Sequence, residues 1–390
     1  MQRRRRMDPR VEPAGDELEK EDKTMQRTKP PFRADHVGSL LRPAALKQAR
    51  ERRAKGEISA DELKAVEDRA IADAIKKQED VGLQSITDGE FRRSWWHLDF
   101  LWGLDGVERS VMDTGIAFAA VTTRNEGVKV TGRLGFSGHP MLEHFKFVKA
   151  HTSRTPKMTI PAPSAMYGRP IGTPIDKKIY PTLDKFFDDL GQAYKKAVRA
   201  FADAGCRYLQ LDEVFIAMLC DPKYRQQMKD RGDDPDALGP LYGDLINMAI
   251  SDIPSDMTVT MHLCRGNYKS TFVGSGGYEA EQEVLFDKIK VNGYFMEYDT
   301  ERAGGFEPLR RLPKGRLAVL GVVTTKTGTL EAKDAIKRRI EEAQKFADLD
   351  QLCLSPQCGF ASTEEGNTLA EEQQWAKLLM IGEVAREVWG

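Results

Sequence analysis

The sequence predicts an α/β protein built as a (β/α)8 TIM-type barrel. Short β-type runs alternate with longer charged segments whose apolar residues recur at helical spacing. Several of the short runs are continuously apolar, which is typical of parallel strands that are buried on both faces. The series contains eight such runs, which is the number of strands in this type of barrel.

The eight expected strands begin after residue 33 and end at residue 355. They are Ala34–Gly38, Leu83–Thr87, Lys157–Pro161, Arg207–Asp212, Thr258–Leu263, Tyr294–Tyr298, Arg316–Val322 and Gln351–Ser355. The β-type composition is clearest at residues 257–261, Met-Thr-Val-Thr-Met, and at residues 317–320, Leu-Ala-Val-Leu. These runs are expected to form the wall of the barrel.

Amphipathic helices are expected between these strands. Ser59 followed by Glu62 has the pattern of a capping box, which predicts a helix from there to about Asp80. Three later segments have the same helical periodicity, namely Leu183–Ala204, Leu330–Ala347 and Thr368–Val388. Residues 102–157 do not fit the repeat and are rich in Val, Thr and Phe. We expect them to form a hairpin or long loop inserted after the second strand, near the mouth of the barrel.

Composition and charge exclude several classes of protein. The 390 residues carry a formal net charge of −1, which gives no general attraction to nucleic acid or to an anionic membrane. No apolar run approaches the roughly 18 residues that a membrane span needs. The five cysteines are sparse for a chain of this length, which disfavours a secreted disulfide framework and favours the reducing cytoplasm.

The first 30 residues differ in composition from the rest of the chain. Residues 1–30 contain a basic cluster, Arg3–Arg6, and a mixed-charge stretch with almost no apolar content. This segment lacks the apolar region of a secretory signal, and we expect it to be a disordered N-terminal extension. Residues 31–390 hold all eight expected strands and are expected to form a single catalytic barrel.

Polar residues stand where several of the expected strands end. They are Gly38-Ser39, Asp88-Gly89-Glu90, Asp212-Glu213, His262, Cys264, Glu297 and Cys358. In (β/α)8 barrels the chemistry takes place at the carboxyl ends of the strands. A charged or metal-binding residue at the end of a buried apolar strand therefore indicates a functional site at the barrel mouth.

Four of these residues are candidate metal ligands. His262 and Cys264 are two positions apart at the end of the fifth strand, so both side chains can bind one ion. Cys358 follows the eighth strand and Glu297 lies in the sixth, so all four converge on one mouth. Nitrogen, thiolate and carboxylate ligands favour Zn²⁺. By spacing alone, a His-x-Cys pair fits a buried core pair as well as a metal site.

Three short motifs surround the candidate ligands, namely His262-Leu263-Cys264, Met296-Glu297 and Gln357-Cys358-Gly359. In order and in separation they resemble the zinc-binding motifs of the cobalamin-independent methionine synthase family. The stretches at residues 34–43 and 87–93 look typical of its single-barrel homologues. The resemblance runs from about Phe32 to the C-terminus, which is the catalytic half of the full-length synthases. It implies a zinc-binding barrel with His262, Cys264, Glu297 and Cys358 as the ligands.

The same resemblance implies a binding site for homocysteine. Val37-Gly38-Ser39 is similar to the loop that holds the homocysteine backbone after the first strand. Gly89-Glu90-Phe91 is similar to the motif whose Glu binds the homocysteine amino group, and residues 209–213 resemble the motif whose Asp does likewise. The implied substrate-binding residues are therefore Val37, Gly38, Ser39, Glu90 and Asp212.

The sequence departs from the family's pattern where the methyl donor is expected. The full-length synthases carry a proton-donating His after the seventh strand, but residues 322–327 contain none. Thr324, Thr325 and Lys326 are the candidates to act on the leaving group in its place. The donor therefore stays open, and methyl transfer from an activated donor is expected to be faster than from methyltetrahydrofolate.

The folate contacts of the family are also missing. The position of its folate-contacting Glu falls near Met218, and its folate-stacking Trp is replaced within residues 161–165. Other aromatic and apolar residues close to these strand ends are candidates for a rebuilt donor pocket. They are Trp95, Trp96, Tyr167 and Met218.

The sequence thus predicts a zinc-dependent thiol alkyltransferase similar to 5-methyltetrahydropteroyltriglutamate–homocysteine S-methyltransferase. The expected reaction is methyl transfer to homocysteine, with a folate, a sulfonium or a corrinoid as the donor, to give methionine. One alternative is attack of a zinc-bound thiolate on another carbon electrophile, as in epoxide:coenzyme M transferases. Glu90 and Asp212 favour an amino-acid thiol, because coenzyme M has no ammonium group. The other alternative is a non-enzymatic structural zinc protein.

Overall fold

Strands and helices alternate along the chain in a computed structural model that describes residues 26–390. The strands are β1 (Ser85–Ile86), β2 (Asp105–Val111), β3 (Glu126–Gly135), β4 (Thr155–Pro156), β5 (Met158–Pro161), β6 (Tyr208–Glu213), β7 (Thr258–Leu263), β8 (Gly293–Glu297), β9 (Leu317–Val323) and β10 (Leu352–Pro356). The helices are α1 (Ala44–Ala54), α2 (Ala60–Asp80), α3 (Leu98–Leu101), α4 (Met141–His151), α5 (Leu183–Asp203), α6 (Phe215–Met218), α7 (Pro222–Arg231), α8 (Pro235–Ala249), α9 (Lys333–Gln344) and α10 (Glu371–Trp389). Most of the predicted disordered extension, residues 1–25, lies outside the described residues.

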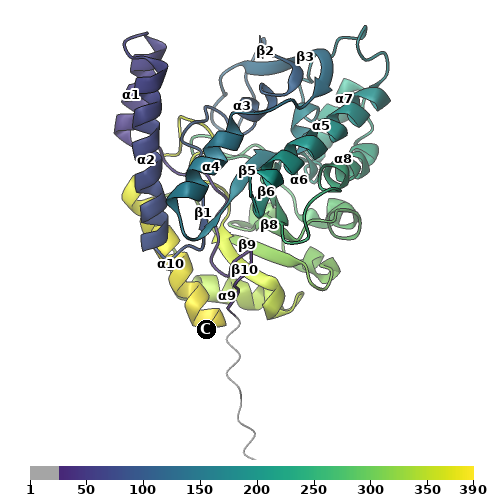
Figure 1. Ribbon diagram of the computed structural model, residues 1–390. Coiled ribbons are helices and arrows are strands. Elements are labelled where there is room, and N and C mark those ends of the chain that lie inside the picture. The colour runs from purple at the N-terminus through teal and green to yellow at the C-terminus, as the bar shows by residue number, and fades with distance from the viewer. Residues whose placement is uncertain (1–25) are drawn as a thin grey trace, which may run out of the picture.

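A six-stranded parallel sheet forms the centre of the fold (Figure 1). Its strand order is β10-β9-β8-β7-β6-β5, so each strand lies beside the one that precedes or follows it in the chain. Every residue of β6 and of β9 is buried, as expected for strands that are covered on both faces. Because all neighbours are parallel, the loops that follow the strands meet at one edge of the sheet.

Short segments continue this arrangement beyond both edge strands. Next to β10, Ala34 forms an isolated parallel bridge with Leu354, and the Asp35 N–H donates to the Leu354 carbonyl over 3.0 Å. Next to β5, the Lys157 N–H donates to the Ile86 carbonyl over 2.8 Å, and β1 pairs in parallel with β4. The predicted α/β class with a parallel sheet is confirmed.

The last six of the eight predicted strands are confirmed to within one residue at each end. The first two are shorter than predicted, because residues 34–38 contribute one bridge and residues 83–87 contribute the two residues of β1. Side-chain contacts replace the missing ladder there. The Asp35 carboxylate accepts hydrogen bonds from the His36 N–H and from Ser85 Oγ, over 2.8 and 2.7 Å. Such contacts offer the backbone an alternative to strand pairing.

The predicted insertion after the second strand contains an antiparallel hairpin of β2 and β3. The pairing runs from Val111 opposite Glu126 to Asp105 opposite Gly135. The loop between the two strands returns to the body of the protein, where residues 114–119 form part of a cavity wall. The insertion therefore supplies one side of the candidate site.

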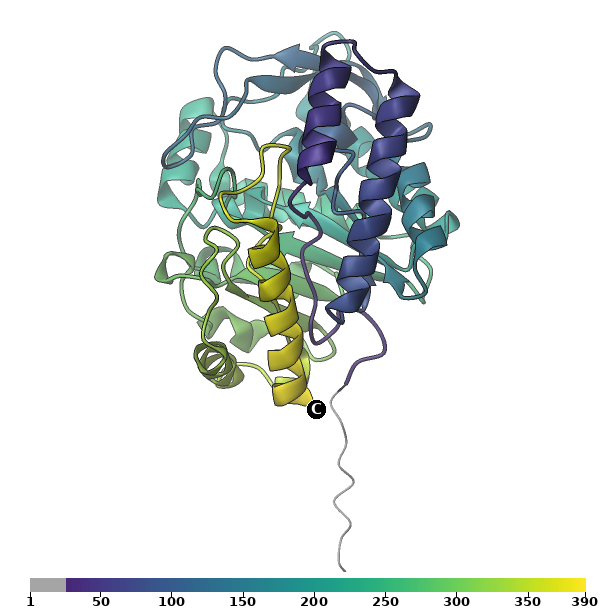
Figure 2. The same ribbon diagram turned by 90° about the vertical axis from the view of Figure 1, so that its left-hand side faces the viewer.

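Helices α1, α2 and α10 lie together on one side of the molecule, and α5 and α8 pack against each other on the other side (Figures 1 and 2). Helix α2 begins with the predicted capping box. Ser59 Oγ accepts from the Glu62 N–H over 3.1 Å, and the Glu62 carboxylate accepts from the Ser59 N–H over 2.7 Å. An ion pair between Lys77 Nζ and Glu371 Oε1, 2.6 Å apart, connects α2 to α10.

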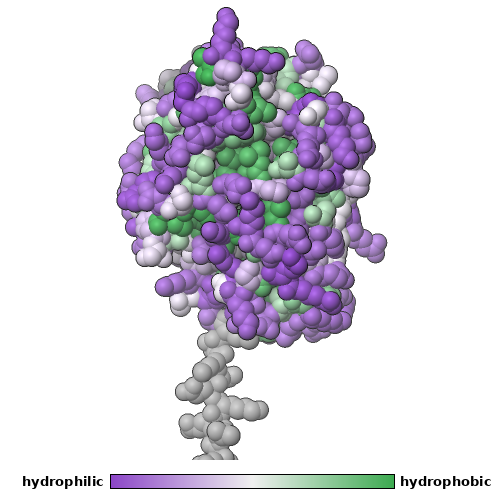
Figure 3. Space-filling view, turned by 90° about the vertical axis from the view of Figure 1, so that its right-hand side faces the viewer, coloured by the Kyte–Doolittle hydropathy of each residue, from purple (hydrophilic) through white to green (hydrophobic). Residues whose placement is uncertain are grey.

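Most of the surface is hydrophilic, but apolar residues gather on one face. Figure 3 shows them in the upper half of that face, with hydrophilic residues on both sides. Large apolar side chains that are substantially exposed include Val111 on β2, Ile171 and Leu183. Within residues 26–390, no helix is both long enough and apolar enough to cross a membrane.

Candidate metal centre and active site

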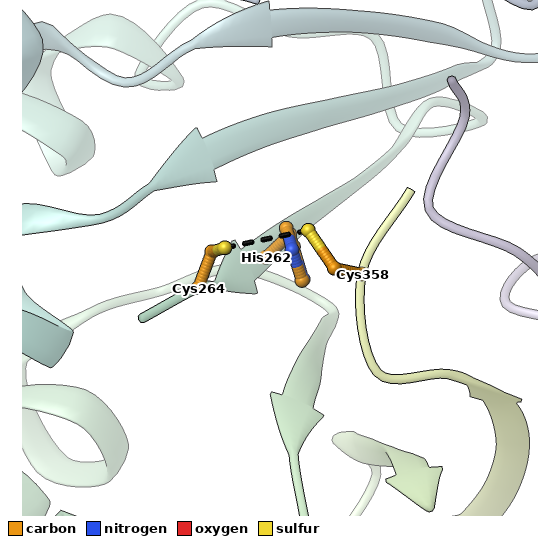
Figure 4. Close-up of side chains that lie close together, drawn as sticks. All are labelled: His262, Cys264 and Cys358. Carbon is orange, nitrogen blue, oxygen red and sulfur yellow. Dashed lines mark hydrogen bonds between the residues drawn. The ribbon is translucent and has the colours of Figure 1, made fainter. Parts of the chain in front are cut away.

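Strand β7 places two of the predicted ligands on one side of the sheet. His262 is its fifth residue and Cys264 follows the strand directly, so alternation along the strand points both side chains the same way. Both are buried, and the buried thiol of Cys358 approaches them from the loop after β10. Figure 4 shows the His262 ring between the two cysteine side chains. Three predicted ligands from two strand ends therefore meet.

These three side chains, the ligand group, lie close enough together to contact one metal ion. Their ligand atoms all lie within 4.8 Å of one another, and the two Sγ atoms of Cys264 and Cys358 are 3.3 Å apart. Both ring nitrogens of His262 are buried and have no hydrogen-bond partner among the described residues. Buried polar atoms without a partner are costly unless another group binds them. One nitrogen and two sulfur atoms are ligands that zinc prefers, so the residues fit this metal.

The surroundings of Cys358 favour the thiolate form that binds metals. The contact between Cys264 Sγ and Cys358 Sγ, together with the His262 ring, holds the pKa of Cys358 well below its usual value. Burial lowers the pKa of His262, but its interaction with Cys358 outweighs that effect and raises it. A bound cation would replace the imidazole in stabilising the thiolate.

Glu297, the fourth predicted ligand, lies at the end of β8 and outside the ligand group. Its Oε2 accepts from the Arg265 N–H over 2.9 Å. Its Oε1 lies 3.3 Å from Lys326 Nζ and also contacts the Arg302 guanidinium. Burial raises the pKa of Glu297, but the charges of Lys326 and Arg302 outweigh burial and bring the pKa to about 2. Glu297 is therefore an ionised carboxylate with protein partners on both oxygens.

Two buried carboxylates, Glu90 and Asp212, line the same cavity as the ligand group. Asp212 in β6 is directly opposite His262 in β7. Glu90 Oε1 accepts from Thr159 Oγ1 over 2.9 Å, while Oε2 lies 3.6 Å from Arg93 and makes no hydrogen bond. Burial, followed by the charge of Glu90, raises the pKa of Asp212 to about 7, and burial raises the pKa of Glu90. A bound ammonium group would relieve this repulsion.

The predicted substrate loop reaches the same cavity. Val37 and Ser39 line it, and Gly38 stands between them with φ at +144°. A Cβ atom on Gly38 would lie 2.8 Å from Thr159 Cγ2 and 3.4 Å from Glu90 Oε1, so this position requires glycine. The loop therefore lies directly beside Glu90, one of the two carboxylates of the acidic pair (Glu90 and Asp212).

One cavity of about 890 Å³ contains most of the predicted site. Among the predicted donor-pocket residues, Trp95, Trp96 and Met218 line it. Tyr167 does not, and its hydroxyl donates to Asp233 over 2.6 Å. The cavity thus connects the ligand group and the acidic pair to three of the four donor-pocket residues.

The residues after β9 lie outside the wall of this cavity. Thr325 is buried, and its hydroxyl takes part in hydrogen bonds within the protein. Thr324 and Lys326 line a second cavity of about 540 Å³. Thr324 Oγ1 donates to Asp299 over 3.0 Å, and Lys326 contacts both Glu297 and Asp299. Lys326 therefore contacts Glu297 and does not line the main cavity.

Residues 32–377 match the family described as "Cobalamin-independent synthase, Catalytic domain". The chain belongs to this family. It is a family of methyltransferases that are similar to methionine synthase. The match includes the whole ligand group and both residues of the acidic pair.

Three relatives illustrate the range of this cobalamin-independent synthase family. The protein YxjG from Bacillus subtilis (strain 168) is 52% identical over 372 residues, which cover 95% of this chain and 98% of YxjG. A methionine synthase from Pyrococcus abyssi (strain GE5 / Orsay) is 27% identical and covers 83% of this chain, and 84% of the relative is matched. A crystal structure from Listeria monocytogenes is 42% identical, with a TM-score of 0.75. It covers 93% of this chain, and all of that protein is matched.

Two further residues of the site are His97, which the sequence places next to the candidate donor-pocket residues Trp95 and Trp96, and Arg302. His97 lines the main cavity, with its ring centroid 4.4 Å from that of Trp96, and its buried Nδ1 has no partner. Burial lowers the pKa of His97 well below its usual value, so the ring is neutral at physiological pH. The run Trp95-Trp96-His97 was the available signal. Arg302, which contacts the Glu297 carboxylate, lies in no recognisable motif.

Proposed function

We propose that this chain is a zinc-dependent S-methyltransferase that transfers a methyl group to homocysteine and forms methionine. One observation carries the proposal: the ligand group shares a cavity with the carboxylates of Glu90 and Asp212. The ligand group suits a soft cation that can bind a thiol, and the acidic pair suits an ammonium group. Homocysteine carries both groups. Membership of the cobalamin-independent synthase family supports the same reaction.

The zinc site of this proposal has His262, Cys264 and Cys358 as its fixed ligands and Glu297 as an exchangeable fourth ligand. The unpartnered nitrogens of His262 and the lowered pKa of Cys358 support this set. Bound zinc would supply a positive centre that keeps the substrate sulfur deprotonated and nucleophilic. A purely structural zinc site would have no use for paired carboxylates beside it in an open cavity.

The amino-acid end of homocysteine is held by residues that line the same wall. Glu90 and Asp212 bind the ammonium group, because two carboxylates with raised pKa values gain a counter-charge when it enters. The loop Val37, Gly38 and Ser39 offers hydrogen-bond donors to the carboxylate. These contacts leave the thiol free to reach the ligand group.

In the reaction, the substrate sulfur attacks the methyl carbon of the donor. A sulfur–carbon bond forms while the bond from the methyl carbon to the leaving group breaks, and the leaving group departs with the electron pair. The aromatic residues Trp95 and Trp96, together with Met218, favour a donor with apolar surfaces. Among the lining residues that the structure describes, Lys223 is the one Lys or Arg, which disfavours a donor with a long anionic tail. The donor of this proposal is therefore an activated one, a sulfonium or a corrinoid.

The proposal includes the predicted eight-stranded barrel, formed as a single unit by residues 31–390. Its first two strands would be the segments that flank the six-stranded sheet. Thr87 Oγ1 donates to the Gly38 carbonyl over 2.7 Å, and just beyond these segments the Leu40 N–H donates to the Gly89 carbonyl over 3.0 Å, so the two segments also contact each other. These contacts support closure, because the same segments already bond to β10 and to the start of β5.

The five cysteines support the reducing cytoplasm as the location of this activity. All of them are buried and none forms a disulfide. Cys264 and Cys358 must remain reduced to bind a metal ion, because the thiolate is the ligand. An oxidising compartment would favour a bond between these two sulfur atoms, which are already close.

The decisive test is formation of methionine by the zinc-loaded protein. Homocysteine is incubated with methyltetrahydrofolate, with a methylsulfonium or with methylcobalamin, and methionine is measured by mass spectrometry. The proposal requires protein-dependent methionine with at least one donor, and loss of this product in Cys264→Ser. Intact zinc binding without methionine from any donor rejects it. Turnover of other thiols but not of homocysteine would instead favour attack on a different carbon electrophile.

A further inference from the structure

The Glu297 carboxylate forms ion pairs with two cationic side chains. Lys326 Nζ lies 3.3 Å from Glu297 Oε1, and the Arg302 guanidinium contacts the same oxygen. The second oxygen accepts the Arg265 N–H over 2.9 Å. With both oxygens occupied in this way, Glu297 lies outside the group of ligand atoms that are within 4.8 Å of one another.

The two cations are themselves fixed by the surrounding protein. Asp299 lies 3.3 Å from Lys326 Nζ and 3.5 Å from Arg302. Arg302 also donates to the Gly274 carbonyl over 2.8 Å, and its guanidinium lies 4.4 Å from the centre of the Phe272 ring. Gly274 and Phe272 both line the main cavity. Arg302 and Lys326, the cationic pair, are therefore held in place by these contacts and form an element directly behind the cavity wall.

The Glu297 carboxylate compensates part of the positive charge of this element and of the nearby buried Arg265. Arg302 and Lys326 supply two positive charges, while Asp299 supplies one negative charge and Glu297 supplies the other. The Lys326 side chain is 12% exposed, so its charge is only partly screened by water. Departure of the Glu297 carboxylate would leave these largely buried cations with less compensation, which is unfavourable.

We propose that Arg302 and Lys326 are positioning residues that form a second binding position for the Glu297 carboxylate. This position is called the seat. This proposal rests on the proposed zinc-dependent function. Glu297 then has two alternative positions: as the fourth ligand in the resting protein, and on the Arg302–Lys326 seat when a substrate thiol takes the fourth position. The seat lowers the cost of releasing the carboxylate, and so sets how readily a thiol gains access. It also assigns Lys326 a role on the metal side of the site rather than beside the donor.

The test compares the parent with Lys326→Gln, Arg302→Gln and the charge-conserving Lys326→Arg. Lys333→Gln is the matched control, because Lys333 forms its ion pairs with Glu383 and Glu387 on the surface. Two measurements do not depend on turnover. One is the rate at which a chelator extracts zinc, and the other is the homocysteine concentration that gives half of the visible spectral change in the cobalt(II)-loaded protein.

Without the seat, the Glu297 carboxylate should stay on the metal. Lys326→Gln and Arg302→Gln should release zinc about tenfold more slowly and need about tenfold more homocysteine, which corresponds to a difference of about 1.4 kcal/mol. Lys326→Arg and Lys333→Gln should resemble the parent. In a Glu297→Gln background, the further change Lys326→Gln should no longer affect the homocysteine titration, because no carboxylate remains to be seated.

Parent-like zinc release and homocysteine titration in both Lys326→Gln and Arg302→Gln would overturn the seat. An equal effect of Lys326→Gln in the Glu297→Gln background would also overturn it, since the lysine would then act through its charge alone. Circular dichroism identifies variants that fold, and either single variant is sufficient for the comparison. A parent that binds no zinc, or shows no spectral response to homocysteine, would instead reject the proposed function itself.

Discussion

Asp212 and His262 stand directly opposite each other on the adjacent parallel strands β6 and β7. Opposite residues on neighbouring parallel strands project to the same face, and the strands are about 4.8 Å apart. The sheet itself therefore fixes the separation between a carboxylate suited to an ammonium group and a nitrogen suited to a metal. A short amino acid with a terminal thiol is the kind of molecule that can reach both.

The ligand group should bind about one zinc per chain. Replacing Cys264 or Cys358 by Ser removes a thiolate that zinc prefers, so metal analysis should find most of the zinc lost. Cys206→Ser is the matched control, because Cys206 is also buried but lies outside the ligand group. Retention of all zinc in both ligand variants would contradict the assignment.

The acidic pair should recognise the amino group of the substrate. Asp212→Asn and Glu90→Gln should weaken homocysteine binding by about 1.5–3 kcal/mol, or roughly ten- to hundredfold, because a charge-assisted contact is lost. Zinc content should stay at the parent level. The exposed Asp203→Asn, which only removes a surface pair with Arg199, is the control.

A second ligand, 4-mercaptobutyrate, is homocysteine without its amino group and therefore isolates the contribution of that group to binding. It should bind the parent more weakly than homocysteine, and the difference should shrink in Asp212→Asn. If both acidic-pair variants bind homocysteine as the parent does, the substrate is not an amino-acid thiol.

Binding of the amino group should depend on pH near neutrality. The pKa of Asp212 is raised to about 7 by burial and by Glu90, so the empty site retains a proton below that pH. An ammonium group needs the ionised carboxylates, so its binding releases this proton. Affinity should therefore rise as the pH increases from about 6 to about 8 and level off above that range. Methionine is the suitable probe, since it has no thiol proton to lose. Asp212→Asn should flatten the profile, and a flat profile in the parent would contradict the argument.

The parallel sheet was predictable because its signal is local. A strand buried on both faces is apolar along its whole length, as residues 317–320 are in β9. The first two strands were predicted too long, because the contacts of Asp35 with Ser85 join residues 50 positions apart and leave no local pattern. Long-range side-chain hydrogen bonds decided where those strands end.

The ligand group was equally accessible to sequence reasoning, because strand alternation places His262 and Cys264 on one face. The position of the Glu297 carboxylate was not, since it depends on Arg302 and Lys326, which come from two separate loops. Tyr167 shows the same difficulty. It follows a strand end, but its hydrogen bond to Asp233 holds it outside the cavity.

The methyl donor should be an activated one. Methyltetrahydrofolate has a poor leaving group, because the departing nitrogen needs a proton. The segment after β9 contains no His, and the histidine that does line the donor side of the cavity, His97, is kept neutral by burial. A sulfonium or a corrinoid-bound methyl group needs no such proton.

Methionine formation should therefore be faster from a methylsulfonium or from methylcobalamin than from methyltetrahydrofolate, in parallel assays at equal zinc loading. Trp96→Ala should raise the KM for the productive donor while leaving homocysteine binding unchanged, because Trp96 lines the cavity and belongs neither to the ligand group nor to the acidic pair. Brisk turnover with methyltetrahydrofolate alone would contradict the prediction and would require an acid within the cavity. His97→Phe would then identify it, since loss of folate-dependent turnover with zinc and homocysteine binding intact would assign that proton to the His97 ring.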